Sequence, residues 1–237
     1  MKSRSEVLPP CAALQTRAGV SIPATFATIT RAHLQGMHRE LSHYDRRYFD
    51  KWYRHPRHRV KTRTDMRRQL GFIVAATEYL LDRPVRTVLD VGCGEGNWST
   101  VLRELRPRAR YTGVDGSEYA VKRFGARRNI HLGTFGTVGK IGLEGPFDLI
   151  LCLGVLNYVK ADELQRGLRQ LRKLAGGVAY LEVFTRADDA TGDFRKTSAP
   201  TPAWYRSTFR GAGFVALGLH CYLPKELASH AAALEKA

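Results

Sequence analysis

The sequence predicts an α/β protein built on a doubly wound, mostly parallel β-sheet. A short apolar run at 88–91 leads directly into a glycine-rich turn and then into a helical pattern at 96–106. A longer apolar run at 147–159 has the composition of a strand that is buried on both faces, as parallel sheets require. Around these runs, strand-like and helix-like segments alternate, which is the order that a doubly wound sheet produces.

The other elements are predicted from the same patterns. Further strands are expected at 111–115, 129–132, 178–184 and 214–222, the last as one closing strand or a hairpin, and helices at 117–128, 161–174 and 204–212. Within 161–174, leucines recur at helical spacing and arginines occupy the other face. Gly213 directly follows 204–212 and is typical of a helix end.

A turn with glycine at every second position follows the first strand, at Gly92, Gly94 and Gly96. Without Cβ atoms the backbone can turn tightly and approach a ligand closely, and the next helix directs free N–H groups at that ligand. A dinucleotide fingerprint would place its third glycine where this chain has Asn97. The carboxylate of Asp90 before the turn would repel a pyrophosphate but could attract an ammonium or a sulfonium.

A second acidic residue, Asp115, ends the next strand, about 20 residues beyond the loop, where a ribose-binding carboxylate is expected. Its two oxygens can accept hydrogen bonds from both ribose hydroxyls. Alternatively, Asp115 merely caps the helix that Gly116 and Ser117 open. The glycine turn upstream favours the ribose role.

The D-x-G-x-G-x-G pattern of 90–96 resembles the first motif of the class I S-adenosyl-L-methionine (SAM)-dependent methyltransferases. The resemblance covers about residues 70–223 and implies SAM as the cofactor. It also implies a Rossmann-like sheet of seven strands, with a final antiparallel strand inserted, and an N-terminal helical cap. The cofactor-binding residues that follow from it are Asp90, Gly92, Cys93, Gly94, Asp115, Gly116, Ser117, Thr134, Phe135, Cys152 and Leu153.

Two positions depart from the family's pattern. Relatives often carry an acidic residue just after the third strand for the adenine amino group, whereas this chain has Thr134 and Phe135, which could supply a hydrogen bond and an apolar wall. Many relatives place a histidine where Asn157 stands, so the polar group here is an amide and not a base. Asn157 and Tyr158 would face the substrate pocket, unless 147–159 is an ordinary core strand and loop.

The resemblance also suggests how the chain is divided. The expected parts are a loose leader at 1–24, a helical cap rich in arginine and aromatic residues at 25–80, the SAM-binding core at 81–223, and a helical C-terminal tail at 224–237. Small-molecule methyltransferases of this class often close the cofactor end with N-terminal helices. His33, Tyr44, Tyr48 and Trp52 are therefore candidate lid residues, the three aromatic ones as substrate contacts.

A general base is the remaining catalytic question. The methyl group of a sulfonium is already electrophilic, so catalysis needs alignment and desolvation more than a covalent intermediate. A phenol or alcohol acceptor would usually want a base, and the candidates are His33 in the cap, Glu182 at the end of the fifth strand and His220 on the last strand. Glu182 and His220 could instead be ordinary hydrogen-bonded strand-end residues.

The chain of 237 residues carries a formal net charge of +16, which attracts anionic partners. Its densest basic stretch, 45–68, interleaves arginines with aromatic residues, as a surface that clamps phosphates and stacks bases would. The aromatic residues also recur at helical spacing, which favours a packed apolar face with arginines toward solvent. The preferred hypothesis is a small-molecule acceptor, which could be anionic, under the cap. The alternatives are an RNA acceptor docked on 45–68 and a non-catalytic binding protein.

Other classes are less well supported. The four cysteines are scattered without metal-ligand spacing, so neither a metal site nor a disulfide framework is expected and a cytoplasmic location is predicted. No apolar run approaches membrane-spanning length. The N/D-P-P-Y/F signature of enzymes that methylate base amino groups is absent, which argues against that chemistry but not against other RNA positions. The oligomeric state and the acceptor atom stay open.

Overall fold

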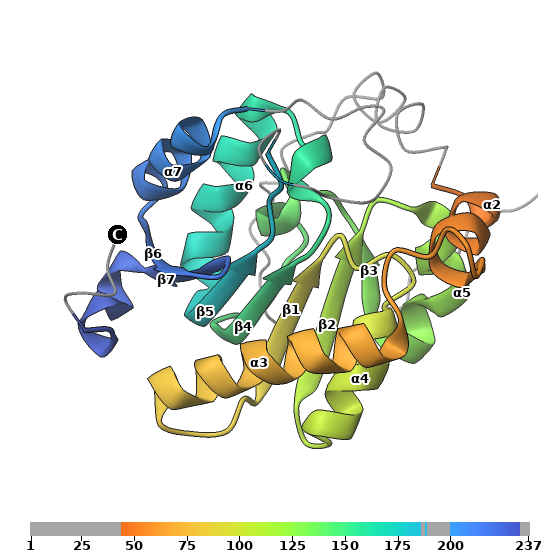
Figure 1. Cartoon of the computed structure of the whole chain (residues 1–237), viewed down its shortest axis with the longest axis horizontal. Coiled ribbons are helices and arrows are strands. Elements are labelled where there is room, and N and C mark those ends of the chain that lie inside the picture. The colour runs from red at the N-terminus through yellow and green to blue at the C-terminus, as the bar shows by residue number, and fades with distance from the viewer. Residues whose placement is uncertain (1–43, 186–187, 189–199, 233–237) are drawn as a thin grey trace, which may run out of the picture.

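A seven-stranded sheet with the strand order β3-β2-β1-β4-β5-β7-β6 forms the centre of the described structure (Figure 1). The computed structural model describes residues 44–185, 188 and 200–232; His33 and the predicted leader 1–24 lie outside them. The strands are β1 (Thr87–Val91), β2 (Arg110–Asp115), β3 (Ile130–Leu132), β4 (Phe147–Cys152), β5 (Ala175–Leu181), β6 (Phe214–Gly218) and β7 (Cys221–Pro224).

The helices alternate with these strands. They are α2 (Arg46–Phe49), the π-helical turn η1 (Asp50–Arg54), α3 (Arg63–Leu81), α4 (Asn97–Leu105), α5 (Glu118–Arg128), α6 (Ala161–Leu174) and α7 (Pro202–Gly211), with 3-10 turns η2 (Val138–Lys140), η3 (Leu156–Tyr158) and η4 (Lys225–His230). No helix in the described ranges is long and apolar enough to cross a membrane.

The sheet is doubly wound about β1, which pairs in parallel with β2 on one side and with β4 on the other. Because the chain moves outward from β1 in both directions, the carboxyl ends of β1 and β4 form a topological switch point, where such sheets bind ligands. β7 pairs antiparallel with β5 and lies between β5 and β6. The predicted seven-stranded, doubly wound sheet is confirmed, including the inserted antiparallel strand, whereas the N-terminal helical cap stays a prediction.

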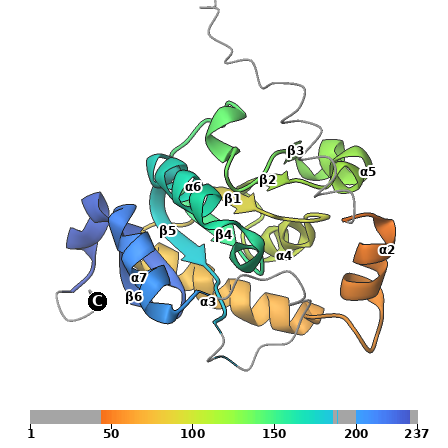
Figure 2. The same ribbon diagram turned by 90° about the horizontal axis from the view of Figure 1, so that it is seen from above.

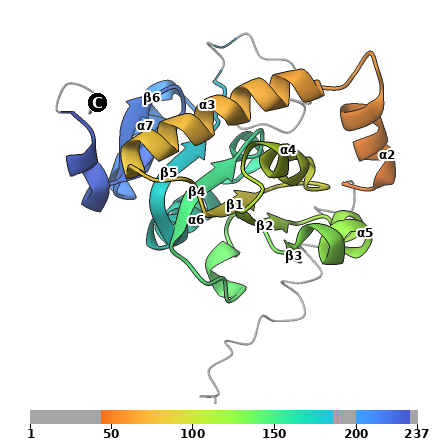
Figure 3. The same ribbon diagram turned by 90° about the horizontal axis from the view of Figure 1, so that it is seen from below.

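Helices cover both faces of the sheet (Figures 2 and 3). α3 and α4 pack on one face, against side chains such as Val88 and Leu149, and α6 and α7 pack on the other, against Leu89 and Ile150. Neighbouring residues of one strand thus contribute to opposite cores, since strand side chains alternate between faces. Both cores are almost fully apolar, which explains why β1 and β4 read as continuous hydrophobic runs.

β5 differs from its predicted span of 178–184, since it runs from Ala175 to Leu181. Glycine lacks a side chain to pack and is depleted in strands. Because Gly176 and Gly177 stand near the start of β5, the sequence pattern did not predict that the strand begins there. A Cβ at Gly177 would lie 2.2 Å from the carbonyl oxygen of Asp148, so the close approach of β4 requires glycine there. The predicted 214–222 strand or hairpin is a hairpin.

The N-terminal segment divides between two places. α3 begins with a capping box, in which the Thr62 side chain and Asp65 satisfy each other's backbone N–H groups. It then buries Leu70 and Ile73 against the sheet, as one of the core layers. α2 and η1 instead lie beside α5 (Figure 1). The division into a cap at 25–80 and a core at 81–223 stays a prediction, as does the tail at 224–237, of which 225–230 forms η4.

Candidate cofactor and substrate site

The glycine loop, residues 92–96, connects β1 to α4 at the carboxyl edge of the sheet. Gly92, Gly94 and Gly96 all have left-handed backbone conformations, with φ of 75°, 56° and 73°. A Cβ at Gly92 would lie 2.2 Å from Cγ2 of Val155, and one at Gly94 would lie 2.9 Å from Cε1 of Phe49. Glycine is therefore required at these positions both by the backbone and by the neighbouring side chains.

Asp115 joins the glycine loop to the next helix. Its Oδ2 accepts a hydrogen bond of 2.6 Å from the N–H of Gly94, and its Oδ1 accepts one of 2.8 Å from the N–H of Ser117. Burial raises the pKa of this carboxyl, while the two N–H donors act to lower it. The cap of α5 is supplied by the Ser117 side chain, which accepts from the N–H of Ala120 at 3.1 Å. Asp115 is thus not needed as the helix cap.

Asp90 is a buried carboxyl at the end of β1. It is 1% exposed and accepts a hydrogen bond of 2.7 Å from the hydroxyl of Tyr111. Burial raises its pKa to about 7, and within the described ranges no cationic side chain forms an ion pair with it. A buried carboxylate in this state is complementary to a cationic ligand, because such a ligand would stabilise the charged form.

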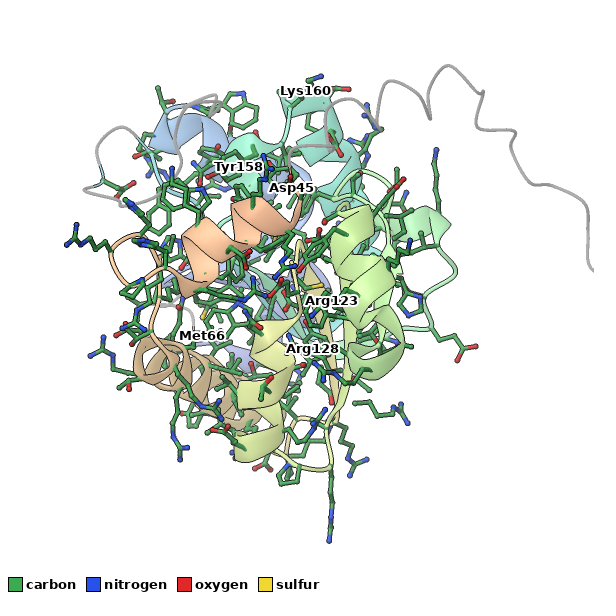
Figure 4. All side chains as sticks on the ribbon, turned by 90° about the vertical axis from the view of Figure 1, so that its right-hand side faces the viewer. Asp45, Met66, Arg123, Arg128, Tyr158 and Lys160 are labelled. Atoms are coloured by element: carbon green, nitrogen blue, oxygen red, sulfur yellow. The ribbon has the colours of Figure 1, made fainter. Side chains whose placement is uncertain are left out.

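The cap segment, residues 44–54, packs onto this loop. Phe49 is 2% exposed and stacks on Tyr119 of α5 with ring centroids 5.8 Å apart. The Tyr53 hydroxyl lies 2.9 Å from the position of a Gly94 Cβ. Tyr53 is 39% exposed as a whole, and the pKa of its hydroxyl, which faces the loop, is raised well above its usual value by burial, with further contributions from Tyr48 and Asp115. Figure 4 looks onto this side, with Asp45 at the start of α2 and Arg123 and Arg128 on α5.

An ion pair ties the cap segment to the glycine loop. Nη2 of Arg54 donates to both carboxylate oxygens of Glu95, at 2.6 and 2.5 Å, and the Glu95 side chain is only 3% exposed. The hydroxyl of Tyr119 donates to the same carboxylate at 3.3 Å. Ser117 adds a third link, because its hydroxyl donates to the carbonyl of Tyr44 at 2.6 Å.

A polar cluster, which we term the Glu182 network, lies at the carboxyl end of β5. The buried Glu182 accepts from Nζ of Lys61 at 3.1 Å and from Nε2 of Gln69 at 2.9 Å. The Gln69 amide nitrogen also donates to the Tyr180 hydroxyl at 3.0 Å. His220 stands next to it, with its ring centroid 5.8 Å from that of Tyr180. Burial lowers the pKa of His220, so its imidazole is neutral at pH 7.

The comparisons with known proteins decide the family. A family model described as a methyltransferase domain matches residues 62–214. The chain belongs to this family. The predicted assignment to the SAM-dependent methyltransferases is thereby confirmed. A protein of Synechococcus described only as uncharacterized is 33% identical over 124 residues, a match that covers 49% of this chain and 28% of that relative. The chain therefore spans less than a third of the length of this relative.

Solved methyltransferase structures share the fold. An amino pentose methyltransferase from Micromonospora echinaspora has a TM-score of 0.52 at 16% identity, over 66% of this chain and 89% of that one. Magnesium protoporphyrin IX methyltransferase from Synechocystis has a TM-score of 0.51 at 20% identity, over 79% and 90%. A SAM-dependent methyltransferase from Archaeoglobus fulgidus has a TM-score of 0.53 at 15% identity, over 72% and 76%. At these identities the likeness establishes the common fold.

In this chain, the aromatic residues predicted for the lid differ in what they pack against. Tyr48 makes edge-on contacts with Tyr44 and Phe49, with centroids 5.0 and 5.4 Å apart, so it belongs to the cluster over the glycine loop. Trp52 instead packs against Lys51, whose Nζ lies 4.6 Å from the Trp52 ring, and against His58. We therefore leave Trp52 out of the proposed substrate contacts.

The segment after β3 contacts α6. Phe135 is 3% exposed and packs in the core against α6, where it would contact a Cβ at Gly167 at 2.2 Å; we leave it out of the proposed site. The hydroxyl of Thr134 donates to Oε1 of Glu163 at 2.8 Å, and the N–H of Gly136 donates to the same oxygen at 3.1 Å. α6 thus supplies the carboxylate that the sequence lacks directly after β3.

The residues after β4 are mainly structural. Asn157 is 3% exposed, and its side chain exchanges hydrogen bonds with the backbone carbonyl and N–H of Phe184. It therefore clamps η3 to the chain beyond β5, and both of its polar groups are engaged. Cys152 is fully buried, while Leu153 and Tyr158 are half-buried. Leu153 and Tyr158 remain predicted contacts at this edge.

Several residues of the site were not predicted as site residues from the sequence. Phe49, Tyr53, Arg54 and Glu95 form the contact between the cap segment and the glycine loop, and Lys61 completes the Glu182 network. Glu95 offered a signal, because an acidic residue between two loop glycines has no role in turn geometry. For Arg54 and Lys61 no signal existed, since they stand among many other basic residues.

Proposed function

We propose that this methyltransferase transfers the methyl group of SAM to a small molecule held at the carboxyl edge of the sheet, next to the cap segment. One observation carries the choice of acceptor. The cap segment packs onto the glycine loop through Phe49 and Tyr53 and is fixed there by the ion pair between Arg54 and Glu95. Such packing narrows access to the cofactor end, whereas a large nucleic acid would need an open surface.

The residues at the carboxyl edge suit SAM. Asp115 offers a carboxylate for two ribose hydroxyls, with its position fixed by Gly94 and Ser117. The three left-handed glycines give the loop the tight turn, without Cβ atoms, that a nucleoside-binding loop of this kind requires. The buried Asp90 lacks a cationic partner among the described residues and would gain one in the amino group of SAM. When bound, SAM supplies an electrophilic methyl group on a sulfonium.

The chain's own residues supply desolvation and a site for a proton. The buried Phe49 excludes water from its side of the glycine loop, which strengthens the electrostatic interactions around Asp90. His220 is neutral at pH 7 and can accept the proton of a hydroxyl acceptor through its imidazole. Glu182 acts on His220 as a nearby negative charge that favours the imidazolium, while Lys61 forms an ion pair with that carboxylate at 3.1 Å. Glu182 is accordingly a positioning residue.

An RNA acceptor is the second candidate, and the pairing of part of the basic charge in 45–68 disfavours it, while Arg57 and Arg59 stay exposed without an ion pair among the described residues. Arg54 pairs with Glu95, Arg63 and Arg67 share Glu104, and Lys61 pairs with Glu182. Cations that already contact carboxylates neutralise phosphates less effectively. The predicted RNA-docking role of this segment is therefore the weaker proposal.

The cytoplasmic location also stays a proposal. Cys93, Cys152 and Cys221 are buried free thiols. Burial raises the pKa of each of them, which keeps them protonated and unreactive. Free cysteines in these positions are compatible with a reducing compartment.

Methyl-label transfer tests the acceptor class. The full chain is incubated with methyl-tritiated SAM and a cell extract split by ultrafiltration into a small-molecule fraction and a purified RNA fraction. We expect label in the small-molecule fraction, none in RNA, and none in either with the Gly94→Val variant. Transfer to RNA alone would overturn the small-molecule proposal. Failure of the wild-type protein to bind SAM in calorimetry would overturn the proposed SAM site itself.

A further inference from the structure

A cavity lies at the edge of the sheet opposite the glycine loop. This is the edge where β1, β2 and β4 begin (Figure 1). The cavity has a volume of about 870 Å³ and is bounded by the chain before β1, the loop between α4 and β2, and the start of β4. We term it the basic cleft. Its charged lining residues are Arg83, Arg86, Arg106, Arg108, Arg110 and Asp148.

The arginines of the basic cleft fall into two groups. Arg83 pairs with Asp148 at 2.6 Å, and Arg106 pairs with Glu78, so both have a carboxylate partner. The other three, Arg86, Arg108 and Arg110, are exposed, and their side chains make no hydrogen bond or ion pair with any described residue. Three unpaired guanidinium groups therefore share one concave surface that contains a single carboxylate.

The backbone that carries these arginines is held in place. Oδ2 of Asp148 accepts from the N–H groups of Arg86 and Thr87, at 2.7 and 3.1 Å, and the N–H of Arg110 donates to the carbonyl of Arg86 at 2.8 Å. Each of the three bounding segments also contains a proline, whose ring fixes φ: Pro84, Pro107 and Pro146. The starting points of the three unpaired side chains are thus set before any ligand binds.

The side chains that line the basic cleft indicate which class of ligand it can bind. A guanidinium donates paired hydrogen bonds that match phosphate oxygens, and the volume lies within the range of small-ligand pockets. No aromatic side chain lines the cleft, so bases would find nothing to stack on, unlike in single-strand nucleic-acid sites. We propose that the basic cleft binds a compact anion that carries two or more phosphate groups.

The basic cleft and the cofactor site are separate. Strands of five or six residues keep their two ends about 17–20 Å apart, and the cleft shares no residue with the glycine loop or with the Glu182 network. The proposed anion is therefore neither SAM nor the methyl acceptor, and both sites can be filled at once.

Calorimetry on the full chain with inorganic tripolyphosphate tests the proposal. A variant with Arg86→Gln, Arg108→Gln and Arg110→Gln removes the unpaired charges, and a matched variant with Arg57→Gln and Arg59→Gln removes two exposed arginines of the basic 45–68 segment. We expect the wild-type protein to bind tripolyphosphate more tightly than orthophosphate. The cleft variant should lose about tenfold or more in affinity, as a loss of several charged hydrogen bonds predicts, and the matched variant about twofold or less.

Three results would overturn the proposal. The first is no tripolyphosphate binding by the wild-type protein, and the second is an equal loss in the two variants. The third is cleft-dependent binding of a single-stranded oligoribonucleotide without binding of tripolyphosphate, which would make this surface a nucleic-acid contact. Circular dichroism and SAM calorimetry on the cleft variant control for folding. A failed SAM site would leave the tripolyphosphate result unaffected, so the two proposals fail independently.

Discussion

The cationic side chains at the two edges of the sheet differ in what they contact. At the carboxyl edge, Arg54 and Lys61 reach Glu95 and Glu182, both buried carboxylates. At the amino edge, three arginines of the basic cleft have no carboxylate partner among the described residues. The cationic side chains that give the chain its net charge of +16 therefore do not all have the same role. Paired cations at one edge hold the chain in place around a ligand loop, and unpaired cations at the other edge are available for an anion.

The largest effect is expected from Gly94→Val, which tests whether the two edges are independent. The left-handed φ of 56° is strained for valine, and the added side chain would meet Phe49 and Tyr53. SAM binding should fall below detection in calorimetry, while tripolyphosphate binding at the amino edge persists. If the variant bound neither SAM nor tripolyphosphate while its circular dichroism spectrum matched that of the wild type, the two edges would not be independent.

The pH dependence of stability tests the buried Asp90. Because burial raises its folded-state pKa to about 7 from 3.8, the folded chain binds this proton more tightly than the unfolded chain. Protonation of Asp90 contributes to the unfolding free energy below pH 4, and this contribution is lost as the pH rises through 7. Between pH 5 and pH 8 the loss is on the order of 3 kcal/mol. Urea unfolding at pH 5 and pH 8 measures this difference in unfolding free energy. It should be smaller in the Asp90→Asn variant than in the wild-type protein. An unchanged pH profile in that variant would contradict the assignment.

Lys61→Met removes the cation of the Glu182 network. Lys61 is 28% exposed and Glu182 only 6% exposed in their side chains, so the variant leaves a buried carboxylate without its counter-charge. Loss of one partner of a buried pair costs about 3 kcal/mol of unfolding free energy. The double variant Lys61→Met/Glu182→Gln should recover much of this loss. Equal stabilities for Lys61→Met and the double variant would contradict the expected recovery.

Asp115→Asn probes the proposed ribose contact and also leaves one oxygen to accept from the N–H of either Gly94 or Ser117, not from both. The amide loses the charge that strengthens hydrogen bonds from the ribose hydroxyls, and such bonds contribute about 1.5–3 kcal/mol. SAM affinity should fall by about tenfold to a hundredfold in calorimetry. Ser117→Ala is the control for the structural part of this loss: Ser117 is itself a predicted cofactor-binding residue, and the variant removes the helix cap and the link to Tyr44 but leaves Asp115 in place. A larger loss in the control would move the ribose role away from Asp115.

The sequence predicted the sheet and the glycine loop because both depend on local patterns. The apolar runs of β1 and β4 and the left-handed glycines are read directly from consecutive residues. The start of β5 was missed because Gly176 and Gly177 carry no side chain to form a pattern.

The site required information that only the folded chain holds. Glu163 supplies a carboxylate to the segment after β3 from 29 residues further along the chain, and Asn157, predicted to face the substrate, clamps Phe184. Charge pairing is equally invisible in the sequence. Arg54 and Arg57 stand three positions apart in the same basic stretch, yet only Arg54 faces a buried glutamate.

The smallest effect compares one arginine from each edge. Arg54→Gln leaves the Glu95 carboxylate with weaker partners and should lower the unfolding free energy by about 1–2 kcal/mol. Arg108→Gln removes no contact and should change it by about 0.5 kcal/mol or less. Hydrogen exchange should sharpen the contrast, because protection in 46–54 falls only in Arg54→Gln. If Arg108→Gln proved the more destabilising variant, the Arg108 side chain would have a structural role. The distinction between paired cations at one edge and unpaired cations at the other would then be wrong.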